Sequence, residues 1–234
     1  MKLVGQSFEI LAPKRGLGQR YAVYSAIVES ARVSYHGDKM IDIPNQSSPE
    51  ATLKRYGNFI RNRIREGHES VFEHAYMRIQ FTTNRAVANE LTRHRVMAWT
   101  QESTRYCNYS LEGFGSEVQF VYSPYFSVGT AGFDSFVQAC EKAEKEYFAL
   151  LNIGYSAQQA RDVLPLATKT TLVGTANLRE WRHLFALRAA ETTGPVHPMM
   201  KQLMVPCLAE AKKLLPDIFF DIGNNDETTG SEDS

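Results

Sequence analysis

The chain has 234 residues, of which 43% are hydrophobic and 22% are charged, a composition typical of folded globular proteins. Because 26 Lys and Arg residues balance 26 Asp and Glu residues, no overall field favours nucleic acid or an anionic membrane. The three cysteines, Cys107, Cys140 and Cys207, lack metal-ligand spacing. With no signal peptide and no apolar run long enough to cross a bilayer, the chain is expected to be cytoplasmic, with reduced thiols.

The first third of the chain is predicted to contain one strand and two helices. Residues 7–11 alternate between apolar and polar side chains, as in a strand, and residues 19–35 carry apolar side chains at helical spacing. A loop rich in turn formers follows over residues 36–50. Ser48 directly precedes a proline, so a second helix is expected to begin there and to end near Gly67.

The rest of the chain mixes strands and helices without strict alternation. A strand is expected over residues 76–84, and Asn84 then caps a helix over 85–97. The later elements are a strand at 118–126, helices at 133–154 and 156–165, a strand at 168–175, and helices at 177–191 and 198–215. This mixture predicts an α+β fold with one domain over residues 1–222 and an acidic, disordered tail over 223–234.

Residues 90–106 gather several cations around an apolar centre. On a helix, Arg93 and Arg95 would diverge by about 200°, with His94 between them, and Arg105 would follow after a loop. The arginines repel one another unless an anion or acidic side chains compensate them, and guanidinium groups suit phosphate and carboxylate. The alternative is a solvated basic face, but the neighbouring Trp99 favours a partly buried anion site.

Three further groups of residues are candidates for chemistry. His68, Glu69, Glu73 and His74 lie close together in the sequence, but the two histidines lack the one-turn spacing of a zinc-protease helix. In the predicted helix 177–191, Asn177 is a possible N-cap, and Arg179, Arg182 and Arg188 individually resemble surface charges. Nearby cations are expected to lower the pKa of the Cys107 thiol, although a small incidental residue is the simpler interpretation.

Arg93, His94 and Arg95, followed after seven residues by Ser103 and then by Arg105 and Tyr106, form a recognisable motif. This motif resembles the signature of flavin-dependent thymidylate synthases. The histidine segment 67–74 and the segment 161–188 are similar to family segments in the same order. The resemblance covers roughly residues 60–195 well and the ends of the chain loosely.

The resemblance implies the thymidylate synthase-complementing type of α+β fold, with helices packed on a mainly antiparallel sheet, in a homotetramer with shared active sites. It also implies reductive methylation of dUMP to dTMP. Methylenetetrahydrofolate donates the carbon, and FAD reduced by NADPH delivers the hydride. No cysteine attacks the uracil ring in this family, which disfavours a nucleophilic Cys107.

The resemblance assigns roles to individual residues. The residues expected to bind FAD are His68, Ser70, Arg93, His94, Arg95, Gln101, Asn177, Arg179 and His183. The residues expected to bind dUMP are Glu90, Arg93, Gln101, Ser103, Thr104, Arg105, Arg161 and Arg188. Arg188 is the expected catalytic residue, because a guanidinium at the N3–O4 edge of uracil stabilises the charge that develops there.

The chain departs from the common family pattern at four positions. Ala98 stands where serine is common, Thr100 where asparagine is common, Gln101 where glutamate is frequent, and His183 where some relatives have asparagine. Gln101 still donates and accepts hydrogen bonds, but it does not act as a carboxylate.

Two other functions stay open at this point. One is a non-catalytic nucleotide- or RNA-binding protein that uses the Arg93–Arg105 cluster, with Trp99, Tyr106 and Tyr109 available for base stacking. The other is a metal hydrolase built on the histidine segment, which would bind zinc. Bound flavin distinguishes the predicted enzyme from both.

Overall fold

The computed structural model describes residues 1–33, 47–111, 113 and 115–223. Most of the expected loop at 36–50 and nearly all of the expected tail at 223–234 lie outside these residues. The chain divides into two compact units, and each unit is assembled from several separate segments. Unit 1 comprises Met1–Ala12, Arg78–Ala176 and Pro198–Leu203, and unit 2 comprises Pro13–Met77, Asn177–His197 and the chain from Met204. The single domain expected over 1–222 stays a prediction.

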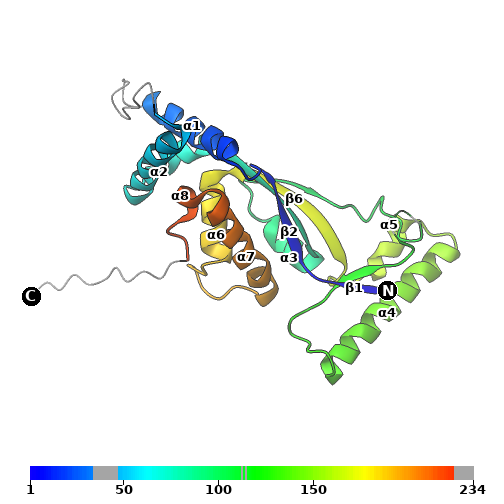
Figure 1. Cartoon of the computed structure of the whole chain (residues 1–234). Coiled ribbons are helices and arrows are strands. Elements are labelled where there is room, and N and C mark those ends of the chain that lie inside the picture. The colour runs from blue at the N-terminus through cyan, green and yellow to red at the C-terminus, as the bar shows by residue number, and fades with distance from the viewer. Residues whose placement is uncertain (34–46, 112, 114, 224–234) are drawn as a thin grey trace, which may run out of the picture. The chain divides into compact units, whose positions relative to one another are not determined.

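A four-stranded sheet forms the centre of unit 1 (Figure 1). Its strand order is β2 (Ser7–Ala12), β3 (Tyr76–Asn84), β6 (Lys169–Asn177) and β4 (Ala98–Gln101). Strands β2 and β3 are antiparallel, as are β4 and β6. Alternate residues of β3 and β6 are buried, which is the period of two that the sequence displays. The expected mixed fold with a mainly antiparallel sheet is confirmed.

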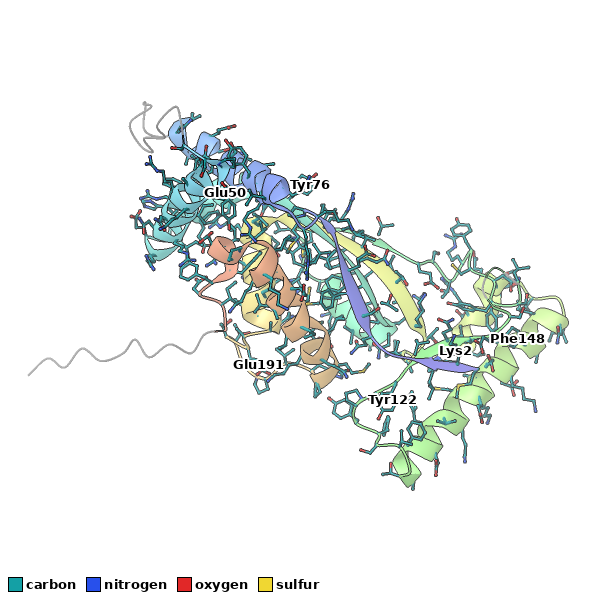
Figure 2. All side chains as sticks on the ribbon, viewed as in Figure 1. Lys2, Glu50, Tyr76, Tyr122, Phe148 and Glu191 are labelled. Atoms are coloured by element: carbon teal, nitrogen blue, oxygen red, sulfur yellow. The ribbon has the colours of Figure 1, made fainter. Side chains whose placement is uncertain are left out.

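A smaller subdomain of unit 1 packs around a second, two-stranded sheet. In this sheet β1 (Lys2–Val4) pairs in parallel with β5 (Gln119–Val121). Helix α4 (Ala131–Asn152) packs against it together with α5 (Ala157–Ala160) and the 3₁₀ helix η4 (Arg161–Val163). Figure 2 shows Phe148 of α4 close to the end of β1 that carries Lys2, and Leu3 and Phe148 belong to the same hydrophobic cluster. The Tyr147 ring, which is fully buried, lies in the centre of this cluster.

Unit 2 is built from helices. Helix α1 (Leu17–Val33) packs on α2 (Pro49–Arg65) and on the 3₁₀ helix η2 (Glu69–His74), while α6 (Leu178–Arg188) packs on η2 and on α8 (Pro216–Phe219). Aromatic rings fill the core, with Trp181 against Phe185 and Phe185 edge-on to Phe219. Helix α7 (Pro198–Leu214) starts in unit 1 and continues in unit 2.

Local sequence signals locate the starts of two helices, α2 and α3, correctly. Ser48, with Pro49 after it, accepts a hydrogen bond from the backbone nitrogen of Ala51 and caps α2. Asn84 caps α3 (Arg85–Leu91) in the same way, through Val87. These side chains satisfy backbone N–H groups that have no partner inside the first turn of a helix.

Two predicted elements near the arginine motif are wrong. The expected helix 85–97 ends at Leu91, because the backbone nitrogens of Arg93 and His94 turn back to carbonyls three residues earlier. Residues 98–101 are strand β4 rather than loop, because they pair with residues 172–175 of β6. Strand β5 is also shorter than the predicted 118–126. Across the part of the chain that the structure describes, no helix is both long and apolar enough to span a bilayer.

Candidate active site

The arginine motif of unit 1 lies in the turn between α3 and β4. Arg93 and Arg95 are exposed, whereas His94 between them is only 8% exposed. Within the described part of unit 1, neither guanidinium group forms an ion pair with an acidic side chain. The two arginines were expected to diverge on a helix, but they lie on a turn instead. The turn exposes two uncompensated cations to solvent. Such a turn suits an anionic ligand.

Trp99 holds this turn against the sheet. Its indole nitrogen donates a hydrogen bond to the backbone oxygen of His94 at 3.1 Å. The ring lies over Gly174 of β6, where an added Cβ atom would be 2.5 Å from the ring carbon Cζ3. Gly174 is thus required for close approach rather than for a special backbone conformation. Because the sheet and the turn occupy the Trp99 ring, base stacking on this side chain is disfavoured.

Residues expected to bind dUMP meet at the next turn. An Arg161 terminal nitrogen of η4 donates to the hydroxyl oxygen of the buried Thr104 at 3.3 Å. The turn itself is closed by Ser103, whose carbonyl accepts from the backbone nitrogens of Tyr106 and Cys107. Arg105 leaves this turn exposed to solvent. The structure therefore brings Ser103, Thr104, Arg105 and Arg161 together although 57 residues separate Thr104 from Arg161.

Gln158 belongs to this group, and sequence reasoning missed it. Its side-chain oxygen accepts a hydrogen bond from Nε of Arg105 at 2.9 Å. Gln158 is located on α5, a helix that begins with a capping box between Ser156 and Gln159. The capping pattern was readable in the sequence, but the pairing with Arg105 was not. Gln158 leaves the two terminal nitrogens of Arg105 available for a ligand.

Glu102 anchors the start of the same turn. Its carboxylate pairs with the Lys169 ammonium at 2.9 Å and accepts from the Tyr109 hydroxyl at 3.3 Å, while its backbone oxygen accepts from Arg85. Glu102, Tyr109 and Lys169 line a cavity of about 290 Å³ in unit 1. Tyr109 is 5% exposed, so it is not available for base stacking on the surface.

The predicted lowering of the pKa of the Cys107 thiol was wrong. Burial and the nearby Glu102 carboxylate raise the pKa of the Cys107 thiol, and they outweigh the opposite effect of Lys169 and Arg85. A thiol with a raised pKa is largely protonated near neutral pH and is a poor nucleophile.

The two other predicted ligand residues of unit 1, Gln101 and Glu90, form hydrogen bonds within the unit. The Gln101 amide nitrogen donates to the Thr170 hydroxyl at 3.2 Å, which fastens β4 to β6. Glu90 is half-buried, and its backbone oxygen accepts from the Arg93 nitrogen. The Gln101 amide nitrogen thus donates a hydrogen bond within the sheet. A glutamate at this position would have no N–H group and could only accept a hydrogen bond.

Unit 2 contains the remaining predicted flavin residues, on η2 and α6. His68 is exposed immediately before η2, with its Nδ1 atom 3.3 Å from Arg63 and 3.5 Å from Glu66, and Ser70 is exposed on η2. On α6, Asn177 is the N-cap, because its side-chain oxygen accepts from the Glu180 nitrogen at 2.9 Å. This local cap engages the side-chain oxygen of Asn177.

The charged residues of α6 differ sharply from one another. Arg179 is exposed and pairs with Glu73 of η2 at 2.6 Å, and His183 is also exposed. Arg188 is half-buried at the last position of the helix. Arg182, which resembled a surface charge in the sequence, is instead buried. Burial raises the pKa of Glu180, and the neighbouring His183 partly offsets this.

The arginines of α6 occupy the carboxylates that a metal site would have needed. Arg182 pairs with Glu69 at 3.1 Å, and Arg179 pairs with Glu73. Among the residues that the structure describes, no group of three or more His, Cys, Asp or Glu side chains is arranged to hold a metal ion. The geometry of η2 therefore favours an ion-paired segment over the hydrolase interpretation.

Comparison with known proteins identifies the family. The family model described as thymidylate synthase complementing protein matches residues 21–217, which is most of the chain. The chain belongs to the thymidylate synthase complementing protein family. This confirms the family resemblance seen in the arginine motif.

Two curated relatives illustrate how similar the chain is to other members. A flavin-dependent thymidylate synthase from Geobacter sulfurreducens is 36% identical over 158 residues, which cover 67% of this chain and 65% of that protein. A protein of the same name from Synechocystis is 32% identical over 165 residues, covering 67% of this chain and 74% of that protein. The chain thus spans slightly less than two thirds of the Geobacter relative.

A solved structure supports the same fold. The UMP/dUMP methylase PolB from Streptomyces cacaoi, bound with 5-Br dUMP, superimposes with a TM-score of 0.72 at 23% sequence identity. The match covers 94% of this chain and 96% of PolB. The family fold is therefore present along nearly the whole chain, while the roles of individual site residues stay predictions.

Proposed function

We propose that this protein is a flavin-dependent thymidylate synthase that converts dUMP to dTMP. The observation that carries the proposal is the convergence of Thr104, Arg105 and Arg161 in unit 1 of a chain that belongs to this family. Guanidinium and hydroxyl groups gathered at one turn are the donors that a nucleotide phosphate requires.

The chemistry of the donor set fits FAD as the cofactor. Arg93 and Arg95 are exposed cations on a turn that Trp99 holds rigid, and they would bind the diphosphate of FAD. By the family resemblance, His68 and Arg179 are also expected to bind FAD, and both are exposed. When bound, reduced FAD supplies the hydride that the methylation consumes.

Within this function, Arg188 acts on the pyrimidine. A guanidinium at the N3–O4 edge of uracil would stabilise the enolate-like negative charge that makes ring carbon C5 nucleophilic toward the one-carbon unit. Arg188 is half-buried at the C-terminal end of α6, and partial burial strengthens such an electrostatic interaction. Gln101, Ser103 and Glu90 would orient the nucleotide, and Arg161 and Arg105 would hold its phosphate.

The finer details of the proposal follow from family membership. Methylenetetrahydrofolate would donate the carbon, NADPH would reduce FAD, and the protein would act as a homotetramer in the cytoplasm. The names of the Geobacter and Synechocystis relatives and the dUMP analogue bound to PolB support the flavin and the nucleotide. The expectations of folate, NADPH and a tetramer rest on the family resemblance.

The first test is the visible absorption spectrum of the purified protein. Bound FAD gives a yellow preparation with flavin bands, and anaerobically reduced protein should be reoxidised faster when dUMP and methylenetetrahydrofolate are added. A colourless preparation that binds no added FAD would contradict the proposal. It would then favour the alternative, a nucleotide- or RNA-binding protein whose nucleic-acid affinity falls steeply with salt.

A pair of variants tests whether the arginine motif binds FAD or is only a solvated basic face. Arg95→Ala should weaken FAD retention, because it removes one of the two exposed cations on the turn. Lys142→Ala, on the exposed side of α4, removes one charge at a place with no proposed ligand. Equal FAD affinity in the two variants would indicate that the cluster is only a solvated surface.

A further inference from the structure

Among the described residues of unit 2, Arg182 is the most completely enclosed charged side chain. It is 8% exposed, and its guanidinium group meets acceptors on three sides. Nε donates to Glu69 at 3.1 Å, the two terminal nitrogens grip Asp221 with 2.8 Å bonds, and one of them also donates to the backbone oxygen of Ile218. A bidentate arginine–carboxylate pair of this kind is both strong and directional.

The charge of Arg182 is stable in this environment. Burial opposes the charged form, but the hydrogen bond and charge of Asp221, together with the charge of Glu69, raise the pKa of Arg182. For the Asp221 carboxyl, burial acts against ionisation, yet Arg182 holds its pKa below the usual value. Removal of either carboxylate would leave the buried Arg182 charge less fully compensated.

Both segments joined by Arg182 carry predicted flavin residues. On η2, Glu69 stands between His68 and Ser70 in the sequence. On α6, Arg182 follows Arg179 by one turn and immediately precedes His183. A displacement of the Arg182–Glu69 pair would therefore move flavin-contacting side chains on both segments.

The η2 segment depends on such a tether for its geometry. It is a six-residue 3₁₀ helix without a side-chain N-cap bond, and such short helices have little intrinsic stability. Its second ion pair, Glu73 with Arg179, is about half exposed on both sides and is therefore weak. Besides the packing of α1, buried Phe72 and the Arg182–Glu69 pair hold the segment in place.

We propose that Arg182 is a positioning residue for the flavin site, where it holds η2 against α6 through Glu69 so that the flavin-contacting side chains of both segments keep one geometry. The inference rests on the proposed function. Arg182 acts through these neighbours and is not itself assigned a contact with the cofactor.

The test compares two ion pairs of unit 2. Glu69→Gln weakens the Arg182 tether while keeping the size of the side chain, and Arg182→Met removes it. The matched control is Arg61→Met, which removes the 2.6 Å pair between Arg61 of α2 and Asp217 of α8, a pair with no member on η2 or α6. For each protein, the unfolding midpoint is measured without FAD, and the FAD dissociation constant and visible circular dichroism are measured well below that temperature.

The tether variants should weaken FAD binding about 10-fold or more and change the visible dichroism of the bound flavin, as expected when binding groups are misplaced. Arg61→Met should lower the unfolding midpoint but leave FAD affinity within about twofold of the wild type, since its pair joins α2 to α8 and no predicted flavin residue is on either helix. If Arg182→Met fails to fold, Glu69→Gln still decides the question, because Glu69 is partly exposed and its loss is milder.

Two results overturn the proposal, and they are distinguishable. If wild-type protein binds FAD and Glu69→Gln binds it equally well, Arg182 has only a stabilising role and the proposed function is unaffected. If wild-type protein binds no FAD at any concentration, the proposed function fails, and the role of Arg182 fails with it.

Discussion

The predicted ligand residues of the two units have different kinds of partners. In unit 1, Thr104 and Arg161 contact each other, and Gln158 accepts a hydrogen bond from Arg105, so that the proposed phosphate donors hold one another in place. In unit 2, Arg179 pairs with Glu73 and Asn177 caps its own helix. A preassembled site loses less conformational freedom on binding. In this proposal, the nucleotide site depends on contacts among its own residues, whereas the predicted flavin residues of unit 2 depend on neighbours such as Arg182.

The largest effect is expected in unit 2, at Arg188. Arg188→Ala should lower kcat for dTMP formation by about 10²–10³-fold, the usual cost of losing one donor to a developing negative charge. FAD should be retained, because the proposed role of Arg188 is on the pyrimidine. The measurement is the rate of dTMP formation together with the visible spectrum, and turnover near the wild-type level would remove Arg188 from the mechanism.

The next effect tests the preassembled site of unit 1. Arg161→Ala should raise KM for dUMP by about 10- to 100-fold, which corresponds to the loss of ~1.5–3 kcal/mol from a charged hydrogen bond. The FAD dissociation constant should stay unchanged, with Lys142→Ala of α4 as the control in both assays. An equal loss of FAD and dUMP affinity would mean that Arg161 supports the fold and not the phosphate.

A third variant tests the support beneath the arginine turn. Gly174→Ala places a methyl group against the Trp99 ring and should lower the free energy of unfolding by about 1–3 kcal/mol, as overpacking usually does. Trp99→Phe, which removes the hydrogen bond to His94 and leaves an aromatic ring, should cost less, about 1 kcal/mol. Urea unfolding measures both. An unchanged stability of Gly174→Ala would show that Trp99 does not lie tightly on β6.

A weaker effect is expected at Gln158. Gln158→Ala removes one hydrogen bond to Arg105 and should raise KM for dUMP about 2- to 10-fold without changing kcat. The split between KM and kcat is the informative readout, because a general loss of stability would change both. If kcat falls and KM does not, the orientation of Arg105 is not what Gln158 contributes.

The smallest effect directly tests the difference between the units. Glu73→Gln frees Arg179 from its exposed ion pair, and such pairs contribute about 0.2–1 kcal/mol. FAD binding should therefore tighten by less than about 5-fold if Arg179 leaves Glu73 to bind the cofactor. Weaker FAD binding would instead indicate that the Arg179–Glu73 pair is part of the bound state.

Several features of this protein could be derived from the sequence alone. The caps at Ser48 and Asn84 depend on residues within four positions, so the starts of α2 and α3 were predictable. Residue types alternate with a period of two along β3 and β6, and this pattern predicted that both segments are strands. The spacing from Arg93 to Ser103 indicated the family, because a short motif keeps its chemistry without reference to the rest of the fold.

Other features depended on partners far away in the chain. The helix predicted through residue 97 fails because Trp99 packs on Gly174 and residues 98–101 join β6. Gln158 approaches Arg105 across 53 positions, and Arg182 meets Glu69 across 113. Local patterns state which face of an element is apolar, but they do not state which distant group will lie against it. The sequence by itself therefore determined the elements and the family, and only the tertiary structure decided which arginines are buried, paired or left open to a ligand.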